Sequence, residues 1–111
     1  MPKFVLLLHG DPSNWEKLSP EEMQQAMERY RAWMHKPFTV GGERLTADAG
    51  KVMRTVDGQI KTTDGPFSET KEIFGGYYMI EAADYDEAVK RASDHPHLKM
   101  GTVEVRQIWE M

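Results

Sequence analysis

Apolar positions along the chain predict strands of two kinds. The segments Phe4–Leu8 and Ile73–Ala82 are apolar at nearly every position, so each is expected to be a strand buried on both faces. Within the second segment, the glycine pair Gly75-Gly76 indicates a bulge or a close approach by another backbone. Its two faces are expected to carry Ile73, Tyr77 and Met79 against Phe74, Tyr78 and Ile80. The second kind alternates apolar and polar residues. Thr102–Trp109 is expected to be such a strand, because Val103 and Val105 alternate with Thr102, Glu104 and Arg106.

Two helices are predicted from their start signals and apolar spacing. Ser19 is the expected N-cap of the first helix, with Glu22 as the reciprocal acid of a capping box, and Pro37 ends that helix. Its apolar face comprises Met23, Ala26, Met27, Tyr30, Trp33 and Met34. Asp84 is expected to cap the second helix, which ends before Pro96. Its buried face is expected to comprise Tyr85, Ala88, Val89 and Ala92.

The middle of the chain predicts a hairpin. Phe38–Val40 is expected to be a short strand that Gly41-Gly42 ends, and His9–Asn14 is expected to be a loop after the first strand. Asp57-Gly58 lies between two strand-like segments and is the dipeptide of a type I′ turn, whose two central residues need positive φ. The flanking strands are Val52–Val56 and Gln59–Thr63.

The order of these elements predicts an α+β fold. Strand, helix and strand are followed by the hairpin and then by a second strand, helix and strand, which is the split βαβ pattern of ferredoxin-like folds with a β-hairpin insertion. A length of 111 residues suits a single domain.

The apolar strands also predict an oligomer. Two helices cover one face of a four-stranded sheet, yet the strands are apolar on both faces, so the second face needs a cover. A second copy of the same sheet is the simplest cover, and we therefore expect a homodimer. The alternative is that the hairpin folds back over that face.

Composition and charge exclude several classes of function. The net charge of -4 argues against binding nucleic acid, which requires a basic surface. The chain has no cysteine, so thiolate nucleophiles and Cys-ligated metals are excluded. No signal-peptide pattern and no apolar stretch of membrane-spanning length is seen, so no membrane association and a cytoplasmic location are expected.

A specific motif follows the hairpin. Asp64-Gly65-Pro66-Phe67 continues through Ser68-Glu69-Thr70-Lys71-Glu72 to Gly75-Gly76-Tyr77-Tyr78, and Gly42-Glu43 and Val103-Glu104-Val105-Arg106 accompany it. Over essentially the whole chain the sequence resembles the DGPF-domain branch of the YCII-related family. The resemblance implies a single YCII-related (DGPF) domain over residues 1–111, with a ferredoxin-like α+β fold and a dimeric α/β-barrel.

The resemblance also bears on chemistry. One branch of the family includes an enzyme that removes HCl from a chlorinated hydroxyquinol, and a His–Asp pair is proposed as its active site. The family's histidine lies on the first helix, where this chain has Ala26, Met27, Glu28, Arg29 and Tyr30. The family's Asp-Pro near the end of the second helix is His95-Pro96 here, so neither member of the pair is present.

Three residues are candidates for acid–base catalysis. Asp64 is a carboxylate expected at a pocket mouth, although an Asp-Gly-Pro segment is also a turn signal in its own right. His9 ends the first strand, where it is either a general base or a surface histidine. Glu72 belongs to the charged run Glu69, Lys71 and Glu72, which is either a pocket rim or a solvated face.

The candidates for substrate binding lie on the strands and at Gly41-Gly42. Glu104 and Arg106 share the face of the last strand that points away from the helices, where they form either a ligand site or a cross-dimer ion pair. Lys71, Glu43 and Tyr77 complete the predicted set. His95 and His97 have the spacing of a metal-binding pair but are more typical of a helix end, so no metal is predicted.

These patterns favour an enzyme that uses acid–base chemistry, without a cofactor, on a small aromatic or phenolic molecule. The alternative is a non-catalytic small-molecule-binding or accessory protein linked to a sigma-factor system, since some family members lie beside such factors. A haem-binding barrel would require an axial ligand among His9, His95 and His97.

Overall fold

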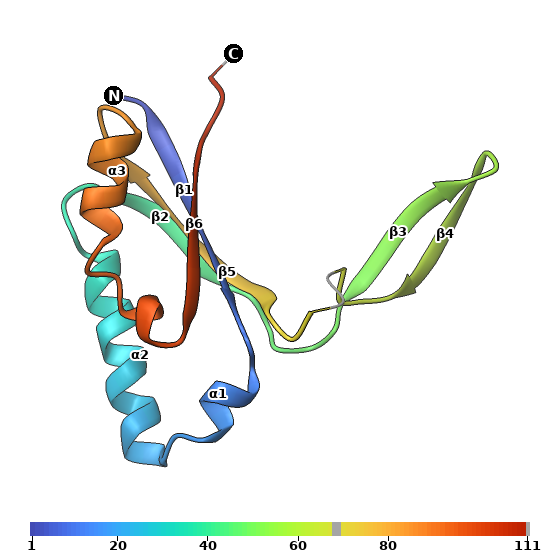
Figure 1. The fold of residues 1–111 in the computed structure, drawn as a ribbon, viewed down its shortest axis with the longest axis horizontal. Helices are drawn as coiled ribbons and strands as arrows, with labels where there is room; N and C mark the ends of the chain where they lie inside the picture. Colours follow the sequence, from blue (N-terminus) through green and yellow to red (C-terminus); the bar gives the residue numbers. More distant parts are fainter. Residues whose placement is uncertain (68–69, 111) are drawn as a thin grey trace.

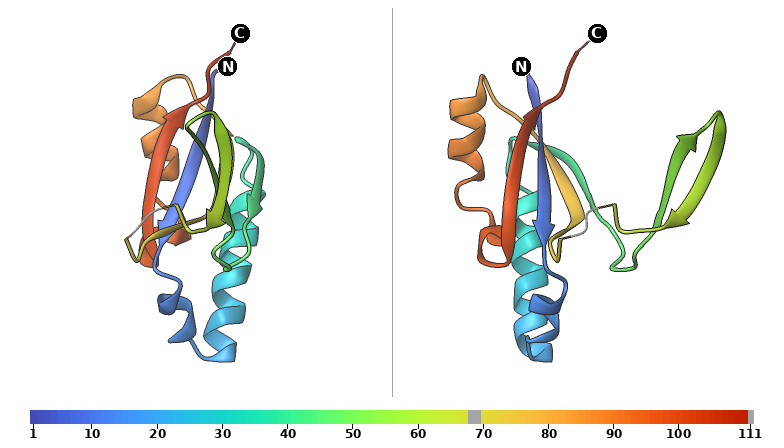
Figure 2. Two further views of the ribbon diagram at one scale, coloured as in Figure 1. Left: turned by 90° about the vertical axis from the view of Figure 1, so that its right-hand side faces the viewer. Right: turned by 45° about the vertical axis from the view of Figure 1, so that its right-hand side comes forward.

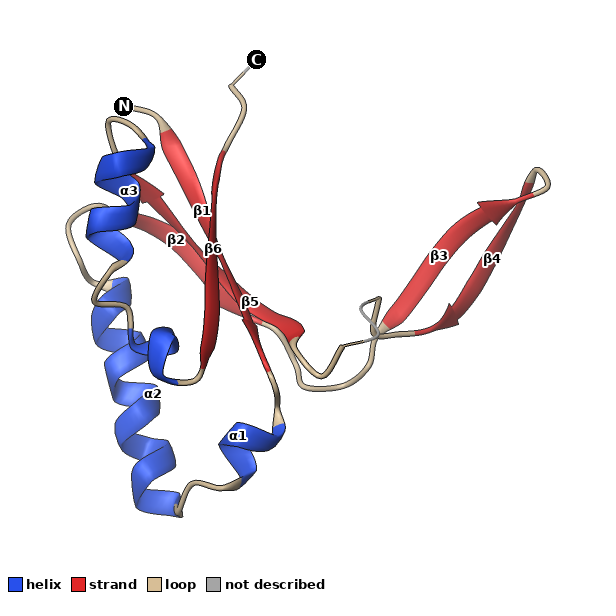
Figure 3. Cartoon of the chain, in the orientation of Figure 1, coloured by secondary structure: helices blue, strands red, loops and turns tan. Residues whose placement is uncertain are grey.

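The computed structural model describes residues 1–67 and 70–110, which form a four-stranded antiparallel sheet, a separate two-stranded hairpin and helices (Figures 1 and 3). The sheet order is β2-β5-β1-β6, which is consistent with a ferredoxin-like split βαβ fold, and the predicted α+β class is confirmed. The elements are β1 (Lys3–Gly10), α1 (Ser13–Glu16), α2 (Pro20–Met34), β2 (Thr39–Arg44), β3 (Lys51–Val56), β4 (Gln59–Asp64), β5 (Ile73–Glu81), α3 (Tyr85–Ala92), the 3₁₀ turn η1 (Pro96–Lys99) and β6 (Gly101–Gln107).

The core lies between the helices and one face of the sheet. Phe4 and Leu6 of β1 are fully buried and stand opposite Ile80 and Tyr78 of β5, because alternate residues of paired strands share a face. Trp33 of α2 packs onto this layer, its ring 5.4 Å from that of Tyr78. We call the sheet face away from the helices the open face.

Helix α2 begins as predicted. The Ser19 hydroxyl accepts the Glu22 amide at 3.1 Å, while the Glu22 carboxylate accepts the Ser19 amide at 3.0 Å. The loop expected over residues 9–14 is partly wrong. Strand β1 continues to Gly10, and Ser13–Glu16 forms a helical turn that starts where the Asp11 carboxylate accepts the Ser13 amide at 2.9 Å. Among the described helices, none is both long and apolar enough to cross a bilayer.

Strand β2 does not end at its glycines. It runs from Thr39 to Arg44 with an irregular register between Thr39 and Gly41, and Gly42 lies close to β5. A Cβ on Gly42 would lie 2.6 Å from the Tyr77 carbonyl oxygen, so these glycines permit close pairing and do not end the strand.

The predicted bulge of β5 is confirmed, and it corrects the predicted faces. The register between β1 and β5 shifts after Leu8, so that His9 stands opposite Phe74. Phe74 therefore joins Tyr77 and Met79 on the open face, whereas the uninterrupted alternation of the sequence had placed it with Tyr78. The close approach is also present, since a Cβ on Gly76 would meet the Glu43 carbonyl at 2.9 Å.

Two further predictions about the second half are corrected. The last strand ends at Gln107, before Trp109. Helix α3 buries Ala88 and Ala92 but leaves Tyr85 45% and Val89 54% exposed, because this short helix contacts the sheet along a narrow stripe. The Tyr85 hydroxyl instead accepts the Gln107 amide at 2.7 Å.

The hairpin has the predicted turn, but it does not fold back over the open face of the sheet. Asp57 and Gly58 have φ of 50° and 79°, as a type I′ turn requires. Figure 2 shows the hairpin of β3 and β4 projecting from the sheet on the side opposite to the helices, without lying back on the strands. Within the described residues, the open face is therefore not covered by the hairpin.

Candidate active site

A cavity of 260 Å³ lies between α2, the short α1 and the β2–β5 part of the sheet. The bulge and the glycines of β2 and β5 create it, because Gly42, Gly75 and Gly76 present no side chains there. Its other walls are Leu8, Trp15, Met27, Tyr30, Arg31, Met34, Glu43, Arg44, Tyr77, Tyr78 and His97. Aromatic residues with a few charged groups are the usual lining of a small-molecule site.

Tyr30 and His97 form the central polar contact of this cavity. The Tyr30 hydroxyl lies 2.7 Å from Nδ1 of His97, and Nε2 of the same ring lies 2.8 Å from the His9 carbonyl oxygen. A carbonyl oxygen only accepts, so Nε2 carries the imidazole proton and Nδ1 accepts from the Tyr30 hydroxyl. His97 is thereby held as a neutral acceptor behind the tyrosine.

The environment keeps both partners neutral. Burial lowers the pKa of His97, while the His9 carbonyl and the charge of Glu72 act in the opposite direction. Burial also raises the pKa of Tyr30, with the nearby Tyr78 adding to the effect and Arg44 opposing it. Burial raises the pKa of Tyr78 to about 12. A neutral histidine behind a protonated tyrosine can accept a proton but does not supply one.

The position of His97 follows from the turn η1. His95 acts as the N-cap of this turn, and its Nδ1 accepts the His97 amide at 3.0 Å. On the other side, a Cβ on Gly101 would lie 2.1 Å from the His9 carbonyl oxygen and 3.0 Å from Nε2 of His97. Gly101 therefore allows β1, β6 and the His97 ring to approach one another.

Arg44 supplies positive charge at the cavity. Its guanidinium lies 5.6 Å from the centroid of the Trp15 ring, and Nη1 is 3.3 Å from the Met27 sulfur. Its charge acts on Tyr30, since it opposes the rise in the pKa of that hydroxyl. An anionic oxygen bound beside Tyr30 would therefore lie within the field of Arg44.

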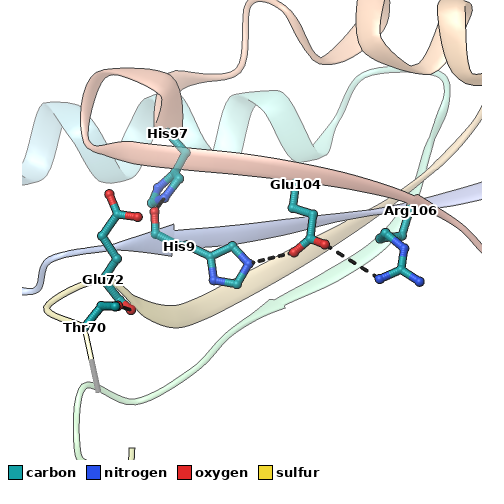
Figure 4. Close-up of polar contacts among 6 residues, drawn as sticks. All are labelled: His9, Thr70, Glu72, His97, Glu104 and Arg106. Carbon is teal, nitrogen blue, oxygen red and sulfur yellow. Dashed lines mark hydrogen bonds and ion pairs between the residues drawn. The ribbon is translucent and has the colours of Figure 1, made fainter. Parts of the chain in front are cut away.

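A second polar cluster lies on the open face, and Figure 4 shows it beside His97. Nε2 of His9 lies 3.1 Å from one Glu104 carboxylate oxygen, and the other oxygen is 3.7 Å from Arg106. The His9 ring also packs against Phe74, with centroids 5.8 Å apart. Strand β1 thus links both faces, through the carbonyl of His9 on one and its imidazole on the other.

The structure brings together some of the predicted site residues. His9, Glu104 and Arg106 meet on the open face, and Glu72 lies beside His97 (Figure 4). Glu43 and Tyr77 border the cavity, but they stand opposite each other in the ladder and their side chains belong to the open face. The others lie elsewhere. Asp64 and Lys51 form an exposed ion pair at the base of the hairpin, Lys71 is exposed and acts on Asp11, and Glu69 lies outside the described residues.

Sequence reasoning missed the Tyr30–His97 pair. It assigned Tyr30 to the core stripe of α2 and His97 to a helix end, and both assignments are compatible with their burial. The signal was present in the resemblance, which locates the family's pair on the first helix and near the end of the second. Residues of those same two regions meet here, but as tyrosine and histidine. Among residues 1–67 and 70–110, no three His, Asp or Glu side chains gather as a metal site.

Fold and cavity together define a small α+β protein with an aromatic cavity on the helix-covered side of its sheet. The chain belongs to the YCII-related family, because the YCII-related domain model matches residues 3–111. The relative "Uncharacterized protein R00369" of Rhizobium meliloti (strain 1021) is 30% identical over 112 residues, covering 95% of this chain and 90% of that protein. The DGPF branch itself stays a prediction.

A solved structure supports the fold. The 5-chloro-2-hydroxyhydroquinone dehydrochlorinase TftG of Burkholderia phenoliruptrix AC1100, in complex with 2,5-dihydroxybenzoquinone, is similar with a TM-score of 0.55. The match covers 97% of this chain and 93% of that chain at 15% sequence identity. At this identity the likeness concerns the fold, and the chemistry of this chain has to be argued from its own residues.

Proposed function

We propose that the protein binds a single-ring phenolic or enolic molecule in the cavity and removes a proton from it. The observation that carries this proposal is the 2.7 Å hydrogen bond between Tyr30 and a neutral His97 at an aromatic wall. Sites for drug-sized ligands span roughly 300–1,000 Å³, so a cavity of 260 Å³ favours a ligand of one ring.

The proton path follows from the tautomer of His97. A substrate hydroxyl would donate to the Tyr30 oxygen, whose own proton is already directed at Nδ1 of His97. As the substrate proton moves to Tyr30, the tyrosine proton moves to His97, which leaves an anionic substrate, a neutral tyrosine and an imidazolium. The His9 carbonyl and the nearby Glu72 stabilise that imidazolium, since both raise the pKa of His97.

The substrate anion needs a positive group at the same wall. Arg44 fits this role because its guanidinium is held on Trp15 and its charge already reaches the Tyr30 hydroxyl. The Trp15 ring at the cavity wall offers apolar surface to a flat ring. The structurally similar dehydrochlorinase acts on a substituted hydroquinone and is in complex with 2,5-dihydroxybenzoquinone, and both molecules are single rings bearing oxygens.

Turnover of hydroxylated single-ring compounds tests the proposal. The absorbance change of 5-chloro-2-hydroxyhydroquinone and related phenols is followed with the wild type, Tyr30→Phe and His97→Gln. We expect each variant to lose about 10²–10⁴-fold in kcat, the usual range for an acid–base group. The controls are Tyr85→Phe and His35→Gln, which alter a tyrosine and a histidine outside the cavity lining.

Two results would contradict the enzymatic proposal. Full activity in Tyr30→Phe would show that the hydroxyl does not carry the proton. Ligand-dependent thermal stabilisation without turnover of any compound would instead indicate a binding protein.

We also propose that the protein is a homodimer in which a second copy covers the open face. By register, the open face carries Val5, Leu7, Tyr77 and Met79. A sheet face that meets water usually carries polar side chains, so this largely apolar face needs a cover. Sedimentation of the wild type at micromolar concentration checks this, and a monomer would overturn it.

A further inference from the structure

The hairpin of β3 and β4 extends the molecule far beyond a compact shape. The radius of gyration is 16.0 Å, and the chain spans 46 × 44 × 18 Å. A compact chain of this length has a radius of gyration of about 13 Å. Figures 1 and 2 show the cause, which is a hairpin that projects beyond the sheet on its open side.

This hairpin lacks the packing that hairpins normally need. Within residues 51–64, all of which the structure describes, Val52 is half-buried and every other strand residue is exposed. A two-stranded hairpin alone is marginally stable at best in water, so such an element is expected to find a surface to pack on.

One face of the hairpin is apolar. Met53 and Ile60 point to the same side by register and are 65% and 67% exposed. Thr55 and Thr62 are their cross-strand partners, so this face carries methyl groups and no charge over the middle of the ladder. Exposed apolar side chains gathered on a projecting element indicate a contact surface.

The other face is cationic. Arg54 stands directly opposite Lys61, and like charges in that position destabilise a ladder unless an acidic group neutralises them. The hairpin carries three cations and two acids, while the whole chain has a net charge of -4. The rest of each chain is therefore acidic and electrostatically complementary to the hairpin.

The base of the hairpin borders the open face. A hollow of 660 Å³ lies there, lined on the sheet side by His9 and Phe74 and on the hairpin side by residues such as Lys51, Val52 and Phe67. Phe67 is 77% exposed at its edge. The hollow thus lies between the sheet and the hairpin, which projects from the sheet in Figure 2.

We propose that the hairpin is a clamp that grips a second copy of this chain seated on the open face. This rests on the proposed homodimer and deepens it. Two-fold symmetry makes the contact reciprocal, so each hairpin packs its Met53–Ile60 face on the other copy. The hollow that contains His9 is then closed only in the dimer.

The test compares two exposed apolar positions. Ile60→Asp places a charge on the apolar face of the hairpin, and Val89→Asp places one on α3, where the valine is 54% exposed. In an isolated chain both changes fall on exposed surface. If the hairpin clamps the second copy, Ile60→Asp raises the dissociation constant of the dimer at least about tenfold in sedimentation equilibrium, while Val89→Asp dimerises like the wild type.

A second readout follows the hairpin directly. Amide hydrogen exchange of residues 51–64 is expected to be slow in the dimer and to speed up on dilution or in Ile60→Asp. If the wild type is a dimer and Ile60→Asp associates as tightly as Val89→Asp, the clamp is wrong and the homodimer stands. If the wild type is a monomer at micromolar concentration, both the homodimer and the clamp are overturned.

Discussion

Replacing His95 with asparagine should make the stability of the protein less sensitive to acid. The His95 ring is 2% exposed and packs 4.5 Å from the ring centroids of both Trp33 and Tyr78. Its Nδ1 accepts the His97 amide, and none of the described residues offers a hydrogen-bond partner to Nε2. Asparagine keeps an acceptor near Nδ1, as a good N-cap residue, and removes the titrating group.

The magnitude follows from the pKa of His95. Burial lowers it to about 4, with the neighbouring His97 adding to the effect and Asp94 opposing it. The unfolded chain binds the proton near its ordinary pKa of about 6.5, so stability falls as the pH drops from about 6.5 towards 4 and levels off below that. Between about pH 7.5 and about pH 4.5 this one group costs roughly 2.5 kcal/mol.

Urea denaturation at the two pH values measures the difference. The wild type should lose roughly 2.5 kcal/mol more than His95→Asn, although the variant is less stable at the higher pH because the ring leaves a gap. The exposed His35 provides a control, since His35→Asn should follow the wild type. Equal losses in the wild type and His95→Asn would refute the reasoning.

Three further predictions concern the site and its supports. A double-mutant cycle of Tyr30→Phe and His97→Gln, measured by urea denaturation, should give a coupling energy of about 1–2 kcal/mol, and additive effects would contradict the hydrogen bond. Gly101→Ala should destabilise the fold by about 1–3 kcal/mol or more and shift the NMR signals of the His97 ring, because the added methyl lies 2.1 Å from the His9 carbonyl. Ser19→Ala should lower the unfolding free energy by about 1 kcal/mol in thermal denaturation, through loss of the cap of α2.

The sequence predicted correctly those parts of the fold that depend on residues close together in the chain. The capping box starts α2 at Pro20, and Asp57-Gly58 forms the turn of the hairpin, because both depend on residues within a few positions. The same reasoning failed at Gly41-Gly42. There the glycines serve a close approach to β5, a strand that lies more than thirty residues away in the sequence.

The candidate site was less predictable. Glu104 and Arg106 were expected on the face of the sheet away from the helices, and they lie there because alternation is readable from the sequence. His9 was expected only at the end of the first strand, and the structure adds its contact with Glu104. Tyr30 and His97 were not predicted to form part of a site, since a tyrosine on a core stripe and a histidine at a helix end are each ordinary in isolation. They meet because η1 packs against α2, a contact between segments 67 residues apart.

The sequence by itself determined the α+β class, the start of α2, the hairpin turn and the two-faced apolarity of the sheet, since each depends on residue type and short spacing. Tertiary structure decided the rest. A one-residue bulge at β5 moved Phe74 to the open face, and the packing of η1 brought two core-like residues, Tyr30 and His97, into a hydrogen bond. It also placed the hairpin away from the sheet, where Met53 and Ile60 are exposed. These outcomes depend on contacts between distant segments, which local spacing does not encode.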